Sequence, residues 1–153
     1  MHALSKASKT IKFIWAAPCS AVGVVFGTIV MLCGGSAKRS RDTLEFTFRD
    51  SEASCGKWAR SLRFRAITFG HVIIAITEQE LAQSRDHELV HVRQYERWGA
   101  AFFVAYPASS LWQWLKGQNT YWDNCFEIQA RALSSEPSGE LRVKQPDKNT
   151  FCD

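Results

Sequence analysis

An uncharged apolar run near the N-terminus limits what this 153-residue chain can fold into. The run covers residues 13–37 and reads FIWAAPCSAVGVVFGTIVMLCGGSA. About 20 apolar residues in a helix cross a hydrocarbon core of ~30 Å, so the run is long enough to span a membrane. Its composition predicts a single-pass membrane helix, with a cleaved secretory signal and a buried or re-entrant hairpin as the alternatives.

Basic residues bracket this run. Residues 1–41 contain six basic residues and no acidic one, whereas residues 42–153 contain 13 basic and 15 acidic residues. The positive charge therefore borders the apolar run and does not form a patch on the folded part of the chain. This pattern favours membrane lipid as a partner and argues against nucleic acid. The five cysteines are odd in number and form no CxxC pair, which predicts no disulfide framework and a reducing compartment.

Short strands are expected directly after the run. Residues 37–42 are polar and basic, and we expect a linker there. Residues 43–49 alternate between apolar and polar side chains, as a half-buried strand does. Residues 66–77 are rich in β-branched side chains and predict one strand, or two short strands joined at Gly70.

Helical signals begin at Thr77. Thr77 and Glu80 have the spacing of a capping box, from which we expect a helix that runs to about Trp98 and ends at Gly99. Residues 84–86 are a possible break within this helix.

A second uncharged stretch covers residues 100–115. We expect a buried helix pair there, kinked or broken at Pro107, with a second membrane segment as the alternative. A loop and a short helix over residues 124–133 follow. The sequence therefore predicts an α+β fold in three parts. These parts are a membrane segment at residues 1–41, a folded domain at residues 42–133 and a disordered tail at residues 134–153.

Residues 87–91 read His-Glu-Leu-Val-His. On a helix, His87 and His91 lie one turn apart on the same face, where two imidazoles can bind one Zn²⁺. Glu88 is close to such an ion without being a ligand, so it can accept a proton from a water that the metal has made acidic. The pattern predicts metal-assisted hydrolysis, as in HExxH metalloproteases. Two exposed histidines without a metal are the alternative.

A catalytic zinc site needs a third protein ligand and an open position for water. The chain has no histidine after His91, so a third ligand must be a carboxylate or Cys125. We expect Glu127 to be this ligand and keep Asp123 in reserve. Glu127 also stands three residues after Asn124, a spacing at which it would only cap its own helix.

HELVH on one helix, followed by Glu-Ile-Gln-Ala at residues 127–130 on a later helix, resembles the gluzincin class of zinc metallopeptidases. Small single-domain minigluzincins and membrane-bound CAAX-type endopeptidases share this arrangement. The stretch HELVHVRQ also resembles the HExxHxxQ zincin-like domains of bacterial proteins. The likeness covers residues 66–133. It implies a small zincin-like domain with a short antiparallel-type sheet, an active-site helix and further helices behind it.

The resemblance also implies roles for single residues. His87, His91 and Glu127 would bind Zn²⁺, and Glu88 would be the general base. The family's aspartate after E-x-x-A is replaced by Arg131, which leaves no partner assigned to His91. The implied function is a membrane-associated zinc peptidase that acts on a peptide or protein. A non-catalytic zinc-binding interaction module and a metal-free membrane protein are the alternatives.

Three further residues are candidates for contact with a substrate. In such enzymes an edge strand before the active helix binds the peptide, and His71 lies in the segment that would provide this strand. Tyr95 and Tyr121 can donate a hydrogen bond to a developing oxyanion. For all three residues, a purely structural role is the competing interpretation.

Overall fold

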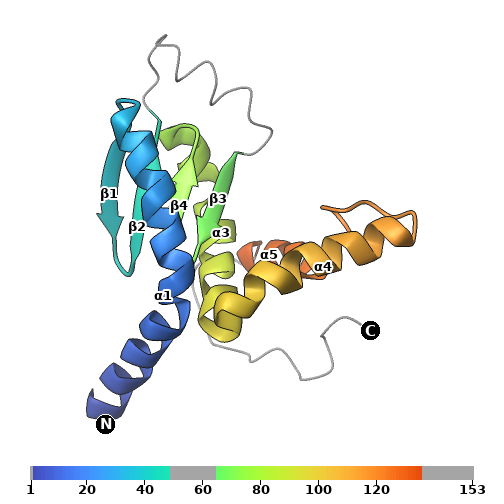
Figure 1. The fold of residues 1–153 in the computed structure, drawn as a ribbon, viewed down its shortest axis with the longest axis horizontal. Helices are drawn as coiled ribbons and strands as arrows, with labels where there is room; N and C mark the ends of the chain where they lie inside the picture. Colours follow the sequence, from blue (N-terminus) through green and yellow to red (C-terminus); the bar gives the residue numbers. More distant parts are fainter. Residues whose placement is uncertain (1, 49–64, 136–153) are drawn as a thin grey trace.

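The computed structural model describes residues 2–48 and 65–135, with side chains from residue 10 onward. Figure 1 shows a four-stranded sheet with helices on both sides. The elements follow one another as α1 (His2–Leu32), β1 (Ser36–Ser40), β2 (Thr43–Thr47), β3 (Ala66–Phe69), β4 (Val72–Ala75), α3 (Glu78–Trp98), η1 (Gly99–Ala101), α4 (Phe102–Leu115) and α5 (Cys125–Ser134). The α+β class is therefore as the sequence predicts, while the tail from residue 136 lies outside the described residues.

The sheet has the strand order β1-β2-β4-β3 and is mixed. The β1–β2 and β3–β4 pairs are antiparallel, and both are hairpins of consecutive strands. The central β2–β4 pair is parallel, with Leu44 beside Val72 and Thr47 beside Ala75. The expectation of an antiparallel-type sheet was wrong at this central pair. Residues 66–77 form two strands joined at Gly70, whose φ of 60° suits the tight turn.

Strand β1 occupies residues for which the sequence predicts a linker. All of its residues except Ala37 are polar and all except Ser40 are exposed, so they show none of the alternation that identifies a strand. The pairing with β2 makes the strand, and the hydroxyls of Ser36 and Thr47 hydrogen bond across it at 2.8 Å. The boundary expected between residues 41 and 42 falls inside this hairpin.

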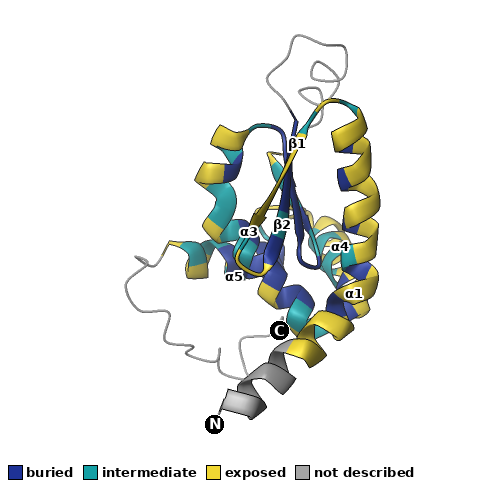
Figure 2. Ribbon diagram, turned by 90° about the vertical axis from the view of Figure 1, so that its left-hand side faces the viewer, coloured by how far each residue is buried: buried dark blue, intermediate teal, exposed yellow. Residues whose placement is uncertain are grey.

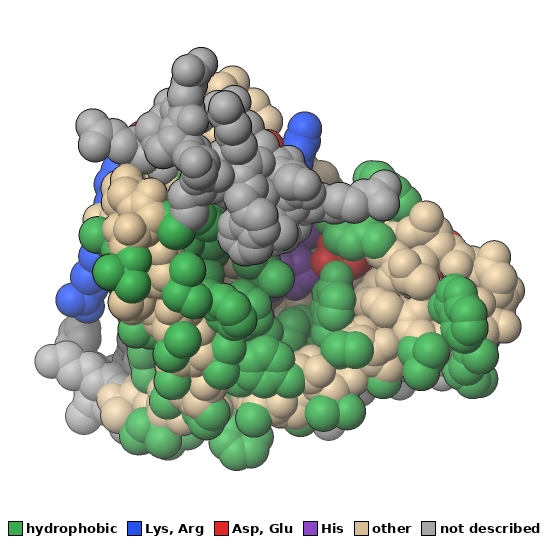
Figure 3. All heavy atoms as spheres, turned by 45° about the horizontal axis from the view of Figure 1, so that its top comes forward, with side chains coloured by type: hydrophobic (Ala, Val, Ile, Leu, Met, Phe, Trp, Pro, Cys, Tyr) green, Lys and Arg blue, Asp and Glu red, His purple; other side chains and the backbone are tan. Residues whose placement is uncertain are grey.

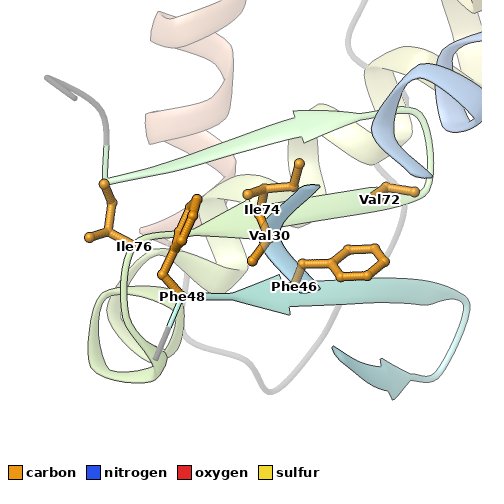
Figure 4. Packing of buried hydrophobic residues seen from close by; sticks show 6 residues of the cluster. All are labelled: Val30, Phe46, Phe48, Val72, Ile74 and Ile76. Atoms are coloured by element: carbon orange, nitrogen blue, oxygen red, sulfur yellow. The ribbon is translucent and has the colours of Figure 1, made fainter. Parts of the chain in front are cut away.

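Strand β2 is buried on both faces, and the prediction of a half-buried strand was wrong. Its apolar face joins the cluster drawn in Figure 4, where Phe46 and Phe48 pack with Val30 of α1. On the other face Glu45 is only 1% exposed. The Arg85 guanidinium donates to both oxygens of this carboxylate, at 3.1 and 3.0 Å, which offsets the cost of burying its charge.

Helix α1 packs on one face of the sheet, and α3 packs on the other (Figure 2). The buried positions of α1 follow a helical spacing of three or four residues and are mostly small; they are Ala16, Cys19, Gly23, Gly27 and Val30. A Cβ atom on Gly23 would lie 2.6 Å from the Cβ of Val72, and one on Gly27 would overlap the Phe46 ring. These glycines therefore bring α1 close to the sheet.

The same helix contains the apolar run. Its stretch Thr10–Leu32 has a mean hydropathy of 1.9 over its most apolar 18 residues and the length needed to cross a membrane. Length and composition alone mark it in this way, and the buried helix of a soluble protein or a signal sequence has the same properties. A membrane anchor and a signal sequence are both compatible with this helix, which also forms part of the core.

Helix α3 has the predicted bounds. The Thr77 hydroxyl accepts a hydrogen bond from the backbone N–H of Glu80 at 3.1 Å, which confirms the N-cap. The helix continues through residues 84–86 without a break and ends at Gly99, whose N–H donates to the Tyr95 carbonyl. On the Glu80 side of the capping box, the Oε2 atom is buried without a hydrogen-bond partner.

Helix α4 contradicts the expectation of a buried helix pair. It is a single helix with Pro107 inside it, and Phe102 is its only buried residue. Its large side chains face outward, with Leu111 and Trp112 each 55% exposed and Trp114 62% exposed.

The cysteines also differ from expectation. Cys33 and Cys125 are each disulfide-bonded, so the prediction of a chain without disulfides was wrong, and with it the argument for a reducing compartment. Cys19 is free and buried against α3 and α4.

Candidate metal centre

The HELVH face of α3 meets α5, and three side chains converge there. The Nε2 atoms of His87 and His91 are 3.1 Å apart. The Glu127 carboxylate faces both, with Oε2 3.1 Å from His87 Nε2 and Oε1 3.2 Å from His91 Nε2. One ligand atom from each of these residues lies within 4.8 Å of the others, and His91 and Glu127 are buried. Among the described residues, this is a group that can hold a metal ion.

The spacing fits a metal. Ligand atoms about 2.1 Å from a tetrahedral ion are separated by roughly 3.4 Å, a few tenths of an ångström more than the three distances seen here. The Glu127 Oε2 atom is buried and accepts no hydrogen bond, although His87 Nε2 is 3.1 Å away. A buried carboxylate oxygen without a donor is costly, and a cation at the centre of the three groups would satisfy it. The donor set of two imidazoles and one carboxylate suits Zn²⁺.

The other oxygen of Glu127 is held in place. Tyr106, on α4, donates from its hydroxyl to Glu127 Oε1 at 2.8 Å. Burial alone would raise the pKa of Glu127, but the imidazoles of His87 and His91 and the Tyr106 hydroxyl outweigh burial and hold that pKa well below its usual range. The carboxylate is therefore ionised, as a metal ligand must be.

Gln94 sets the orientation of His91. Its amide nitrogen donates to the Phe126 carbonyl at 3.0 Å and to Gln129 Oε1 at 2.9 Å, so its oxygen must face His91. That oxygen is 2.8 Å from His91 Nδ1 and accepts the Nδ1 proton. In neutral His91 the lone pair is then on Nε2, the atom that lies 3.1 Å from His87 Nε2 and 3.2 Å from Glu127 Oε1. Gln94 thus supplies the partner that the sequence left unassigned, and it joins α3 to α5.

Glu88 lies on the same buried face. The Thr68 hydroxyl, on strand β3, donates to Glu88 Oε2 at 2.7 Å. Burial raises the pKa of Glu88, and the nearby His91, Thr68 and His87 counteract part of this rise. A carboxyl group with a raised pKa beside a candidate metal site has the property that a general base needs.

Asp123 and Cys125, the other candidate ligands, are not members of the group formed by His87, His91 and Glu127. Asp123 accepts a hydrogen bond from the Asn119 backbone N–H at 2.8 Å and so stabilises the loop before α5. Cys125 is disulfide-bonded and is not available as a thiolate. Asn124, and not Glu127, caps α5, by accepting a hydrogen bond from the Phe126 N–H.

His71 and Tyr95 are placed in structural contacts. The His71 ring stacks on Phe13 of α1 with centroids 3.9 Å apart, and its Nε2 atom is 3.4 Å from Glu96 Oε1. It therefore lies where α1 meets α3. Tyr95 is 4% exposed and packs against Phe102 in the cluster that contains Cys19.

Tyr121 is near the candidate ligands. Burial raises the pKa of Tyr121 to about 12, and the charge of Glu127 adds to the rise. A second tyrosine, Tyr106, donates to Glu127 Oε1 at 2.8 Å and was not among the residues predicted from the sequence. Its position, 21 residues before Glu127 in an apolar stretch, carried no signal of a site.

Arg131 occupies the position of the family's aspartate. Its Nη1 atom lies 4.0 Å from Glu127 Oε2, one helical turn away, and its guanidinium stacks over Trp122 and donates to the Trp122 carbonyl. A positive charge close to a metal ligand is a departure from the resemblance, because it repels a bound cation.

Comparison of the chain with protein-family models, with curated proteins and with solved structures gave no match. The argument for a function therefore rests on the geometry of the candidate metal centre.

Proposed function

We propose that this protein is a membrane-associated, zinc-dependent peptidase. The observation that supports the proposal is the convergence of His87, His91 and Glu127 on one point, with Glu88 on the same face of α3. The resemblance to gluzincins was drawn from residues on two helices, and the contact between α3 and α5 brings those residues together. The zincin-like fold is part of this proposal.

In the proposed reaction, separate residues would bind the metal, position its ligands and transfer protons. His87, His91 and Glu127 would hold the ion, and Gln94 and Tyr106 keep His91 and Glu127 in position. Zinc bound there would lower the pKa of a coordinated water to about 7 and polarise a peptide carbonyl. Glu88 would accept the proton of the attacking water and deliver it to the nitrogen of the leaving amine. Thr68 holds Glu88 Oε2, which leaves Oε1 for that transfer.

Membrane association belongs to the proposal as well. The stretch Thr10–Leu32 would attach the chain to a bilayer, and the expected substrate is a peptide or protein that reaches the membrane surface. The single crossing that the sequence predicts stays a prediction.

A non-catalytic zinc-binding module is the second candidate. It is favoured by the burial of Glu88, which is 5% exposed, because a general base must reach the reacting water. In this case the three ligands would serve to join α3 to α5.

Two substitutions separate these functions. We expect the purified full chain to contain about one zinc ion, measured by elemental analysis, and His91→Ala to contain none. Glu88→Gln should keep the zinc and lose cleavage of a mixture of defined peptides, followed by mass spectrometry. Glu78→Gln, at an exposed position of the same helix, is the matched control and should keep both.

Each result has a clear reading. Stoichiometric zinc with peptide cleavage that depends on Glu88 supports the peptidase. Zinc without cleavage by the wild-type chain supports the binding module, and a wild-type chain without zinc refutes both.

A further inference from the structure

Helices α1 and α4 together present a large apolar surface, which we call the apolar platform. Its members are between 37% and 72% exposed; they are Ile14, Val22, Val25, Phe26, Ile29, Phe103, Val104, Leu111, Trp112, Trp114 and Leu115. Figure 3 shows hydrophobic side chains gathered over one face of the molecule. Soluble monomers rarely expose so large an apolar area, so the platform needs an occupant.

The two helices form one continuous surface. The Phe26 ring of α1 stacks on the Phe69 ring of β3 with centroids 5.5 Å apart. The Phe69 ring in turn lies 6.2 Å from that of Phe103 on α4. A row of three aromatic rings therefore connects α1 to α4 across the edge of the sheet, and a single flat partner can contact both helices.

The charges around the platform suit an anionic lipid surface. Neither Thr10–Leu32 nor Phe102–Leu115 contains an acidic residue. One basic side chain borders it, because Lys116 lies over the Trp112 ring at the end of α4, whereas Lys12 of α1 forms an ion pair with Glu96. Exposed tryptophans at that end are typical of the boundary between lipid headgroups and acyl chains. An apolar face with interfacial aromatics, a basic neighbour and no acidic residue favours an anionic bilayer.

The packing of α1 argues against a helix surrounded by lipid. From Ala16 to Val30, about 21 Å of helix at 1.5 Å per residue, its buried stripe lies against the rest of the fold, and α1 contacts all four strands. A crossing of the ~30 Å hydrocarbon core by α1 would carry the sheet into that core. In the part of the chain that the structure describes, β1 is an edge strand that exposes Lys38 and Arg39. Unpaired strand edges and charged side chains are not stable in hydrocarbon.

We infer that α1 lies in the plane of a bilayer and does not cross it, and that the apolar platform of α1 and α4 sits on the membrane. The sheet and α3 then stay on the aqueous side. This arrangement uses both properties of α1, because its narrow stripe of small residues packs on the sheet while its broad apolar face enters the lipid. It does not depend on the metal centre.

Flotation with vesicles tests the occupant. We expect the full chain to float with vesicles of phosphatidylcholine and phosphatidylserine, and less with phosphatidylcholine alone. Val25→Glu on α1 and Val104→Glu on α4 should each lower the partition coefficient by roughly tenfold or more, because a charge replaces three apolar carbons in lipid. Leu133→Glu, at an exposed apolar position of α5, is the matched control and should float like the wild type.

Thermal unfolding of each variant by circular dichroism shows whether it is folded, since both sites are exposed. A folded wild-type chain that does not float with vesicles overturns the inference. A wild-type chain that buries the platform in a dimer, detected by analytical sedimentation, overturns it as well.

Topology separates lying in the plane from crossing. Epitope tags are added at both ends of the full chain, and sealed membrane vesicles from expressing cells are treated with protease. In-plane binding predicts that the two tags share one side, so that both are digested or both are protected. Tags on opposite sides, or loss of the N-terminal tag by cleavage, overturn the inference. Neither experiment uses zinc or peptide cleavage, so failure here refutes the mode of membrane association and leaves the proposed peptidase chemistry to its own tests.

Discussion

Gln94 offers a sharp test of how the candidate metal centre is built. It is 5% exposed and makes three hydrogen bonds, to His91 Nδ1, the Phe126 carbonyl and Gln129 Oε1. Gln94→Met keeps the shape of the side chain but removes all three. The His91 N–H is then buried without a partner, while the Phe126 carbonyl keeps its bond within α5, so we expect a loss of about 1–3 kcal/mol in the free energy of unfolding. Zinc affinity should fall by about 10–100-fold, because His91 is no longer oriented.

Gln94→Glu separates the two roles of this residue. A carboxylate still accepts the His91 Nδ1 proton, so we expect zinc affinity within about threefold of the wild type. Its second oxygen, however, faces two acceptors. Gln129 can turn its amide and donate, whereas the Phe126 carbonyl cannot, so the free energy of unfolding should still fall by about 2–3 kcal/mol.

The assays are zinc titration against a competing chelator and urea unfolding of the metal-free chain. Gln83→Met, at an exposed position of the same helix, controls for the loss of an amide and should change neither quantity. If Gln94→Glu loses zinc as severely as Gln94→Met, or if Gln94→Met keeps it, the assignment of Gln94 as the residue that orients His91 is refuted.

Two further predictions concern the contacts of α1. Gly27→Ala places a Cβ atom against the Phe46 ring. Although alanine has the better helix propensity, this overpacking should lower the free energy of unfolding by about 1–3 kcal/mol. A thermal midpoint of the variant at or above that of the wild type contradicts this prediction. The contacts with His71 and Lys12 outweigh burial and lower the pKa of Glu96, so its ion pairs stabilise the fold at neutral pH and lose their effect as pH falls through that lowered value. The difference in the free energy of unfolding between the wild type and Glu96→Gln should therefore shrink in acid, which urea unfolding over a pH series measures. A difference that stays constant with pH contradicts this prediction.

The sequence predicts the local elements around the site well. The Thr77 cap, the bounds of α3 and the turn at Gly70 follow from interactions between residues a few positions apart. The shared face of His87 and His91 follows from helical geometry alone. These features need no knowledge of the rest of the fold.

Other features depend on segments that are distant in the chain. Strand β1 has no alternating pattern and exists because β2 pairs with it. Glu45 looks like a solvent-facing position until Arg85, 40 residues later, covers it. Helix α4 is as apolar as a core helix, yet the described part of the fold places little against it.

By itself, the sequence determined that the imidazoles of His87 and His91 and the carboxylate of Glu88 would share one face of a helix, because backbone hydrogen bonding sets the spacing of neighbouring side chains. Only the tertiary structure decided that Glu127, Tyr106 and Gln94 complete the candidate centre, because contacts between α3, α4 and α5 depend on how whole faces pack. It also decided the use of the apolar run. Hydropathy measures only how much of a helix avoids water, whereas packing decides which face meets the sheet and which is left for another apolar partner.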